Sequence, residues 1–334
     1  MKTPPPITLP QGVRDILPEE AERIAKVESA ILSTFKRYGF RRVITPLLEY
    51  VDTLSLGMGR DMKTKVLKFM EPGSGMVMAI RPDITPQIAR LVATRMRDYP
   101  LPLKLYYNEN VFRYADGGGE RSKEILQIGA ECVSGDASPE ADSEMVVMAI
   151  DALKKTGLKD FKIDIGDVGF VKKVLARLAV PDEEKRKIKD AIAKKDNSGL
   201  ESILKTSGGI ITGADRKLLL SLATFYGEKE VIKKAMSFSK DPALKESLEY
   251  LKKTIDIIGR KGCMDSITID LGEVRGFDYY TGIIFEGFAE NVGTPILSGG
   301  RYDTLLEKYG YPVKSTGFAF DVEDIVTALG GNSL

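Results

Sequence analysis

The 334-residue sequence contains no histidine. This absence excludes every mechanism in which an imidazole acts as a base, a nucleophile or a metal ligand, so proton transfer would fall to carboxylates, tyrosines or lysines. Cysteine is scarce as well. The two cysteines, Cys132 and Cys263, match neither a disulfide framework nor a metal-binding spacing, and we expect both to be reduced and buried in a cytoplasmic protein.

Long apolar runs are also missing. No stretch approaches the roughly 18 consecutive apolar residues that a membrane span needs. The N-terminal stretch MKTPPPITLPQG has prolines where a signal peptide has an apolar segment, so we predict no export. The 49 basic and 48 acidic residues nearly cancel, and the net charge of +1 gives no overall electrostatic argument for a nucleic-acid partner.

The patterns that are present predict an α+β fold. Pro18 opens an amphipathic helix that ends at Gly39, and Ser138 caps a second helix that ends at Gly157. Alternating residues predict strands between these two helices and again from SITIDL onward. Between them, about residues 171–263 are lysine-rich and helical in period. We therefore predict a mixed antiparallel sheet flanked by helices in residues 1–170 and 264–334, with residues 171–263 as an inserted helical domain.

The stretch VFRYADGGGERSKEILQIGAE, residues 111–131, contains a candidate binding site. Its second half alternates, so Gln127, Gly129 and Glu131 share one face of a strand. The missing side chain of Gly129 would leave room for a ligand on the sheet. Arg113 on the preceding strand offers the planar fork of donors that suits a carboxylate. These residue types together predict a site for a small amino acid or a similar zwitterion.

Plainer interpretations of the same residues remain open. Arg113 and Glu131 can form a structural ion pair, which the general rule for charge pairs favours for this stretch alone. In RPDITPQ, Thr85 precedes Pro86 and is typical of a helix N-cap, the interpretation that we favour for Thr85 taken singly. Further polar residues lie in RGFDYYTG, predicted as a strand, and in GGRYD; their tyrosines can equally be ordinary sheet residues.

Taken together, these stretches resemble class II aminoacyl-tRNA synthetases, and histidyl-tRNA synthetase in particular. LPQGVRDILPEE is similar to the N-terminal signature of that enzyme, and FRRVITPLLEY to the first class motif, which contributes to the dimer interface. RPDITPQ, VFR…QIGAE, RGFDYYTGIIFE and GGRYD follow in the order of the histidine-specific segments. The resemblance implies a class II synthetase-like fold and extends over most of the chain.

The resemblance also implies a site for free histidine. Asp83 would meet the amino group, Arg113 would hold the carboxylate, and Gln127, Glu131 and Tyr280 would surround the imidazole. The other implied members of the site are Thr85 beside Asp83, Arg275 at the position of the activating arginine, and Tyr279 and Tyr302 in the pocket wall. No catalytic residue, cofactor or metal ligand is predicted.

The chain departs from the synthetases where they bind ATP. Ala115 and Ile125 stand where the family has an acidic residue and an adenine-stacking aromatic. In the last motif, GFAFDVEDI, Asp321 replaces a glycine and Asp324 replaces the phosphate-binding arginine. Carboxylates repel a polyanion unless a metal intervenes. The sequence also ends where the synthetases continue into an anticodon-binding domain, so we expect neither adenylation nor tRNA reading.

A histidine site without a nucleotide site resembles the regulatory-subunit family of ATP phosphoribosyltransferase. The resemblance implies a non-catalytic subunit that supports a short-form catalytic subunit in a hetero-octamer, forms a homodimer through its synthetase-like core, and binds L-histidine for feedback inhibition. The main alternative is a truncated synthetase paralogue that activates an amino acid for a carrier other than tRNA, favoured by the retained Arg275. A weaker alternative is an RNA-binding module formed by the lysine-rich helices. Acidic residues are interspersed among these lysines, which favours an ordinary solvated surface instead.

Overall fold

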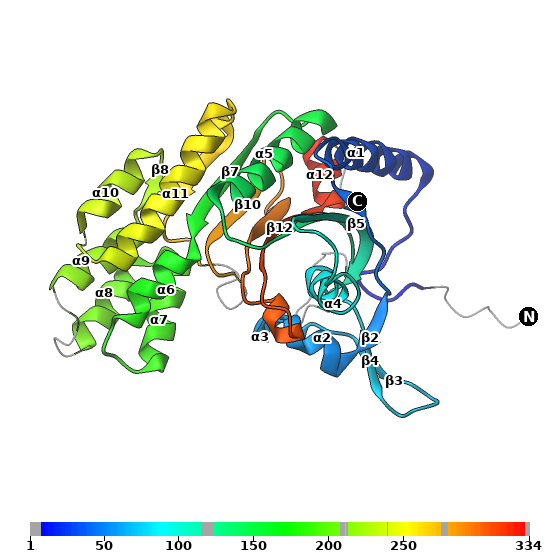
Figure 1. Cartoon of the computed structure of the whole chain (residues 1–334), viewed down its shortest axis with the longest axis horizontal. Coiled ribbons are helices and arrows are strands. Elements are labelled where there is room, and N and C mark those ends of the chain that lie inside the picture. Colours follow the sequence, from blue (N-terminus) through cyan, green and yellow to red (C-terminus); the bar gives the residue numbers. More distant parts are fainter. Residues whose placement is uncertain are drawn as a thin grey trace, which may run out of the picture.

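The central element of the fold is a nine-stranded mixed sheet flanked by helices (Figure 1). The computed structural model describes residues 8–114, 123–207, 211, 213–238, 240–274 and 280–330, apart from the side chains of residues 60 and 61. Neighbouring strands of the nine-stranded sheet run antiparallel, except for the parallel pairs β1–β5 and β7–β9. In spatial order the strands are β1 (Arg41–Arg42), β5 (Leu103–Phe112), β6 (Glu124–Ser134), β12 (Lys314–Asp321), β11 (Leu297–Arg301), β10 (Ile283–Ala289), β7 (Phe161–Asp167), β9 (Ile267–Asp270) and β8 (Tyr226–Gly227). The predicted α+β class is confirmed.

One face of the sheet is covered by helices α1 (Pro18–Arg37), α5 (Pro139–Thr156) and α12 (Val322–Ala328). The boundaries predicted for α1 and α5 are confirmed. Ser138 Oγ accepts a hydrogen bond from Ala141 N at 3.1 Å, and Gly157 ends α5 with a φ of 94°, a conformation that favours glycine. The large core beneath these helices includes the buried cysteines Cys132 and Cys263.

The opposite face carries a second, smaller core under helix α4 (Thr85–Arg95). Strand β5 alternates between the two cores: Leu105 and Tyr107 point toward α4, and Tyr106 points toward α1. A three-stranded sheet stands beside this face. Its strands and the neighbouring helices are β2 (Leu48–Tyr50), β4 (Val77–Ile80), β3 (Lys68–Met70), α2 (Val51–Gly57) and α3 (Arg60–Thr64).

Residues 171–263, which the sequence predicts as an inserted domain, form a mainly helical block at the left of Figure 1. The block packs against the rest of the fold through α11, which contacts α5 and β7, and its two-residue strand β8 pairs with β9. The prediction of a purely helical block was wrong, because the block contains strand β8. Two residues are too few to show the alternating pattern of a strand. The domain limits stay a prediction. The helices are α6 (Val168–Ala176), α7 (Asp182–Ala193), α8 (Asn197–Thr206), α9 (Gly213–Leu222), α10 (Glu230–Phe238) and α11 (Pro242–Arg260).

Three other strand predictions need correction. Strand β7 was not predicted, although Phe161, Ile163 and Ile165 alternate in its sequence and are buried. Strand β11, which contains the two glycines and the arginine of GGRYD, was not predicted either. The strand predicted over RGFDYYTGIIFE begins only at Ile283, so Tyr280 precedes it, and residues 275–279 lie outside the described part of the chain. No described helix is long and apolar enough to cross a membrane.

Candidate amino-acid-binding site

Glu131 lies at the centre of the candidate site. Its side chain projects from β6 toward α4 and is only 1% exposed. Oε1 accepts a hydrogen bond of 2.6 Å from Thr85 Oγ1 at the start of α4, and Oε2 accepts one from Tyr302 Oη just after β11. Three segments far apart in the sequence therefore meet at one carboxyl group.

Burial dominates the titration of Glu131. Removal from water raises the pKa of its carboxyl group to about 8, against the two hydroxyl hydrogen bonds that lower it, and nearby Asp83 raises it further. The group therefore holds a proton over much of the neutral range. A carboxyl group in this state can donate a hydrogen bond to a ligand nitrogen, and in its ionised state it can accept one.

The hydrogen bond of Thr85 corrects the capping prediction. The N-cap of α4 is Ile84, whose side chain makes no capping bond, and Thr85 Oγ1 points to Glu131 instead. The turn is stabilised by Asp83, whose Oδ1 accepts a 2.8 Å hydrogen bond from Ile84 N. Thr85 thus belongs to the group of side chains that the resemblance implies, and the plainer interpretation was wrong.

Arg113 lies beside Asp83 and does not pair with Glu131. Its Nε donates to the Pro82 carbonyl oxygen at 2.9 Å, and within the described part of the chain Arg113 and Glu131 form no ion pair, so that alternative was wrong. Burial raises the pKa of the Asp83 carboxyl group, while the charge of Arg113 and the N–H groups of Ile84 and Thr85 oppose the rise. A guanidinium group and a carboxylate stand together at this edge of the site.

Gln127 brings an unsatisfied polar atom to the site. Its Nε2 donates to Asp321 Oδ1 at 3.0 Å across the paired strands β6 and β12. The amide oxygen Oε1 is buried and has no hydrogen-bond partner among the described residues. Because leaving a buried acceptor unpaired costs about 1–3 kcal/mol, a ligand that donates to this oxygen would be favoured.

Gly129 does not leave the open space predicted from the sequence. Tyr107, its cross-strand neighbour on β5, lies over it, and a Cβ on Gly129 would overlap the Tyr107 hydroxyl. The correction adds a second unsatisfied atom, since Tyr107 Oη is buried with no hydrogen-bond partner in the described chain. A different glycine is required by Glu131: Gly317 faces it on β12, and a Cβ there would overlap the Glu131 carboxyl group.

Tyr280 completes the group of described side chains. It packs against Gly300, where an added Cβ would lie 2.9 Å from its ring carbon Cδ1, and its carbonyl oxygen accepts a 2.7 Å hydrogen bond from Lys172 Nζ. Burial, Asp83 and Glu131 raise the pKa of its hydroxyl group. The structure thus brings together Asp83, Thr85, Gln127, Glu131, Tyr280 and Tyr302 with Arg113 at the edge, and Arg275 and Tyr279 lie outside the described residues.

The positions at which the chain departs from the synthetases lie close to the sheet. Asp321 ends β12 and accepts from Gln127, and Asp324 Oδ2 in the first turn of α12 accepts a 3.1 Å hydrogen bond from Thr294 Oγ1. Ile125 packs against the smaller core. Ala115 lies outside the described residues. The carboxylates of Asp321 and Asp324 therefore serve contacts within the chain.

A buried ion pair behind the site was not predicted. Arg301 Nε and Nη2 donate to the two carboxylate oxygens of Asp142 on α5 at 2.9 and 2.8 Å, and Tyr250 Oη on α11 donates to the same group at 2.8 Å. Arg301 directly precedes Tyr302, so this pair fixes the backbone that presents Tyr302 to Glu131. Arg301 is part of GGRYD, but nothing in the sequence indicates that it pairs with Asp142.

The sheet, its flanking helices and this site define a class II aminoacyl-tRNA synthetase-like protein. A family model described as histidyl-tRNA synthetase matches residues 12–325. A solved structure described as an ATP phosphoribosyltransferase regulatory subunit/histidyl-tRNA synthetase from Bacillus halodurans superimposes with a TM-score of 0.90 at 30% identity, covering 99% of this chain and 85% of that one. A histidine–tRNA ligase subunit from Alicyclobacillus acidocaldarius gives 0.82 at 26% identity, with 98% of both chains covered.

The curated relatives are more specific. The ATP phosphoribosyltransferase regulatory subunit of Geobacter sulfurreducens is 44% identical over 327 residues, which cover 98% of this chain and 74% of the relative. The subunit of the same name from Moorella thermoacetica is 39% identical over 325 residues, covering 97% and 82%. The chain belongs to the family of ATP phosphoribosyltransferase regulatory subunits, and the resemblance predicted from its sequence is confirmed.

Proposed function

We propose that this chain is a non-catalytic regulatory subunit of ATP phosphoribosyltransferase, acting in the cytoplasm in the first step of histidine biosynthesis. It supports the activity of a short-form catalytic subunit in a hetero-octamer and takes part in feedback inhibition by L-histidine. The names of its relatives support the regulatory role. The proposal needs histidine to favour one state of the complex over another, because a ligand that binds both equally shifts nothing.

The observation that carries the ligand assignment is the buried carboxyl group of Glu131 beside the unpaired amide oxygen of Gln127. A ligand ring with one N–H group and one unprotonated nitrogen satisfies both, because the N–H donates to Gln127 Oε1 and the other nitrogen accepts from protonated Glu131. Free histidine supplies these groups, and its carboxylate suits the guanidinium group of Arg113 at the edge of the site. Asp83, next to Arg113, suits the ammonium group. The complementary charges of this edge favour a zwitterion over a ligand of one sign.

The acidic residues near the end of β12 argue against nucleotide activation by this chain. Asp321 and Asp324 stand where the synthetases have a neutral residue and a phosphate-binding arginine, and both accept hydrogen bonds within the chain. A triphosphate placed beside them meets like charge, at about 1 kcal/mol per close pair in water and more when desolvated. This supports a chain without adenylation activity.

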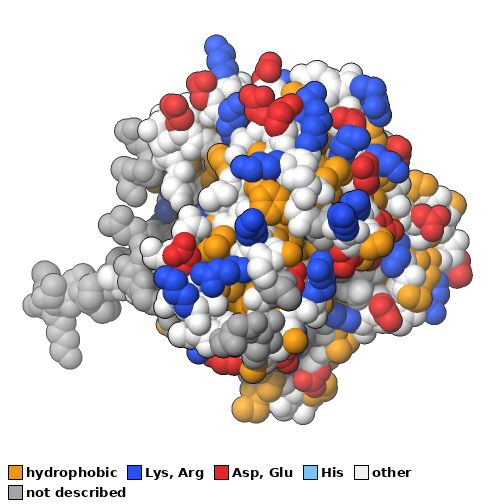
Figure 2. Space-filling view, turned by 90° about the vertical axis from the view of Figure 1, so that its left-hand side faces the viewer, with side chains coloured by type: hydrophobic (Ala, Val, Ile, Leu, Met, Phe, Trp, Pro, Cys, Tyr) orange, Lys and Arg blue, Asp and Glu red, His pale blue; other side chains and the backbone are white. Residues whose placement is uncertain are grey.

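Self-association is part of the proposal. The segment that resembles the first class motif exposes Ile44 (70%), Leu47 (49%) and Leu48 (39%), and Met70 (68%) lies exposed on the neighbouring small sheet. Contiguous exposed apolar residues are typical of an interface. The helical block offers no comparable support for RNA binding, since Figure 2 shows its Lys and Arg side chains intermixed with Asp and Glu.

Phosphoribosyl transfer by the matched short-form catalytic subunit tests the proposal. We expect this chain to raise the rate and added histidine to lower the rate of the mixture. Histidine-dependent exchange of pyrophosphate into ATP by the chain alone is the matched control, because a truncated synthetase would give exchange. No effect on transfer, with or without exchange, would contradict the regulatory role.

A further inference from the structure

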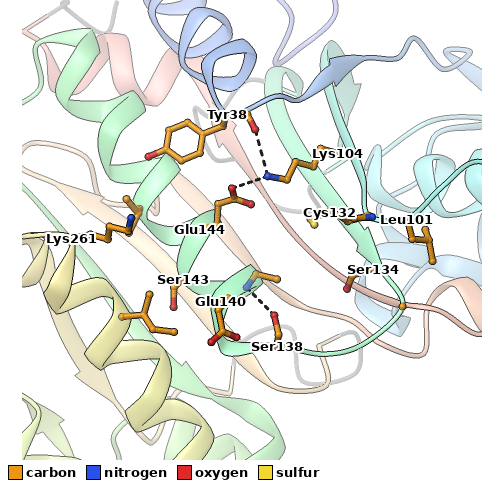
Figure 3. Close-up of a pocket in the computed structure, with 15 residues that line it drawn as sticks. Tyr38, Leu101, Lys104, Cys132, Ser134, Ser138, Glu140, Ser143, Glu144 and Lys261 are labelled. Atoms are coloured by element: carbon orange, nitrogen blue, oxygen red, sulfur yellow. Dashed lines mark hydrogen bonds and ion pairs between the residues drawn. The ribbon is translucent and has the colours of Figure 1, made fainter.

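A cavity of about 760 Å³ lies on the sheet face opposite Glu131 (Figure 3). We name it the rear pocket. Its floor includes Cys132, which follows Glu131 on β6 and therefore points to the other face. The start of β5, the first turns of α5 and the end of α11 form its walls. Its volume falls in the range of roughly 300–1,000 Å³ that is typical of small-molecule sites.

The walls of the rear pocket are largely apolar. Leu101 and Pro102 come from the segment before β5, Val147 from α5 and Ile257 from α11. Such walls suit a ligand with a sizeable apolar body, and a few polar groups are then needed to orient it. Segments that are distant in the sequence supply these walls, so the pocket exists only in the folded chain.

Four charged side chains line the pocket, two of each sign. Lys104 Nζ donates to Glu144 Oε1 at 2.7 Å and lies 3.5 Å from the carbonyl oxygen of Tyr38, so these two charges already have partners. Glu140 on α5 and Lys261 at the end of α11 are exposed, and neither forms an ion pair with another described residue. Figure 3 places them on different walls. One anionic and one cationic group are thus available for a ligand.

We propose that the rear pocket is a second small-molecule site, for a zwitterion of the amino-acid type with a large apolar side chain. The ligand carboxylate pairs with Lys261, its ammonium group pairs with Glu140, and its side chain lies against the apolar walls. A polyanion such as a nucleotide meets the carboxylates of Glu140 and Glu144, and a simple amine leaves Lys261 unpaired. Strand β6 separates this pocket from the Glu131 site, so both ligands can bind together.

L-tryptophan is a suitable probe because the chain contains no tryptophan and the indole emission comes from the ligand alone. We expect its fluorescence anisotropy to rise on titration with the full chain. Lys261→Glu and Glu140→Lys should each weaken binding by roughly three- to tenfold, because an attractive rim contact becomes repulsive. The double variant Lys261→Glu/Glu140→Lys exchanges the two charges. It should recover affinity for L-tryptophan, with the carboxylate of the ligand at position 140 and its ammonium group at position 261. Tryptamine and indole-3-propionate, which each lack one charge, should bind more weakly.

Lys253→Glu is the matched control, since Lys253 is an exposed lysine of α11 that does not line the pocket. It should leave L-tryptophan binding unchanged. Binding should also persist in Glu131→Gln, which separates this inference from the histidine proposal. The second site would be overturned if the anisotropy of L-tryptophan did not change at millimolar concentrations of the chain. It would also be overturned if Lys261→Glu and Lys253→Glu had equal effects on L-tryptophan binding.

Discussion

The hydroxyl group of Tyr302 donates a hydrogen bond to the carboxyl group of Glu131, across 171 residues of sequence. Tyr302 is held by the Arg301–Asp142 pair on one side, and Glu131 by Thr85 on the other. The candidate site is therefore assembled from groups that constrain one another before any ligand arrives. Such constraint reduces the entropy that ligand binding must overcome.

Removal of this hydrogen bond should weaken histidine binding. Tyr302→Phe keeps the ring in the smaller core but leaves Glu131 Oε2 without its donor, and an unpaired buried group costs about 1–3 kcal/mol. We expect a lower free energy of unfolding by this amount and roughly tenfold weaker histidine binding. Chemical denaturation and calorimetric titration measure the two effects. Tyr311→Phe, whose hydroxyl lies 3.3 Å from the Arg97 carbonyl oxygen in an exposed contact, should change neither substantially.

Protonation of Glu131 should make the stability of the free chain depend on pH. The folded pKa of about 8 lies above the ordinary value of 4.5, so the folded state holds a proton that the unfolded state loses between these values. This contribution is fully present below pH 4.5 and disappears as the pH rises through 8, with a size on the order of 3–5 kcal/mol. Denaturation midpoints of wild type and Glu131→Gln should diverge as the pH rises. Parallel pH profiles for the two proteins would contradict the assignment.

Gly317 should be intolerant of a methyl group. A Cβ at this position overlaps the Glu131 carboxyl group, so Gly317→Ala must displace the group that defines the site. We expect a loss of roughly 1–3 kcal/mol of stability, as for other overpacked positions, together with loss of histidine binding. Gly293→Ala is the control, because its Cβ would meet no atom within 4 Å. Equal histidine affinity in both variants would be inconsistent with the geometry of the site.

The Asp142–Arg301 pair should contribute far more than an exposed ion pair. Both side chains are at most 3% exposed, so Asp142→Asn leaves Arg301 buried without its full counter-charge, at a cost of about 3–5 kcal/mol. Glu183→Gln, which breaks the exposed pair with Arg186, should leave the free energy of unfolding almost unchanged, because water screens that pair. Urea denaturation of the two variants compares these costs directly. Similar midpoints would show that the buried pair is not important for stability.

Periodicity predicted much of the fold because its helices begin and end with strong local signals. Pro18, Ser138 and Gly157 act within one turn of their own helix, and the structure has the predicted boundaries there. Strand β8 could not be predicted, because two residues carry no period and its pairing with β9 is decided by tertiary contacts. Strand β7, by contrast, carries an alternating signal in Phe161, Ile163 and Ile165.

The site was less accessible to sequence reasoning than the fold. Alternation placed Gln127 and Glu131 on one face of β6, which the structure confirms. Local preference then misled on Thr85, whose capping tendency is overridden by a hydrogen bond to Glu131, 46 residues away. The position of Tyr107 over Gly129 depends on strand register, which a single sequence does not reveal.

The central claim is that histidine bound at Glu131 regulates the transferase complex. The most direct test is the histidine inhibition curve of phosphoribosyl transfer, measured with the catalytic subunit and either wild type or Glu131→Gln, with Glu183→Gln as the surface control. We predict that Glu131→Gln still raises the transfer rate in the absence of histidine but needs at least about tenfold more histidine for half-inhibition. Superimposable inhibition curves for wild type and Glu131→Gln would contradict the account.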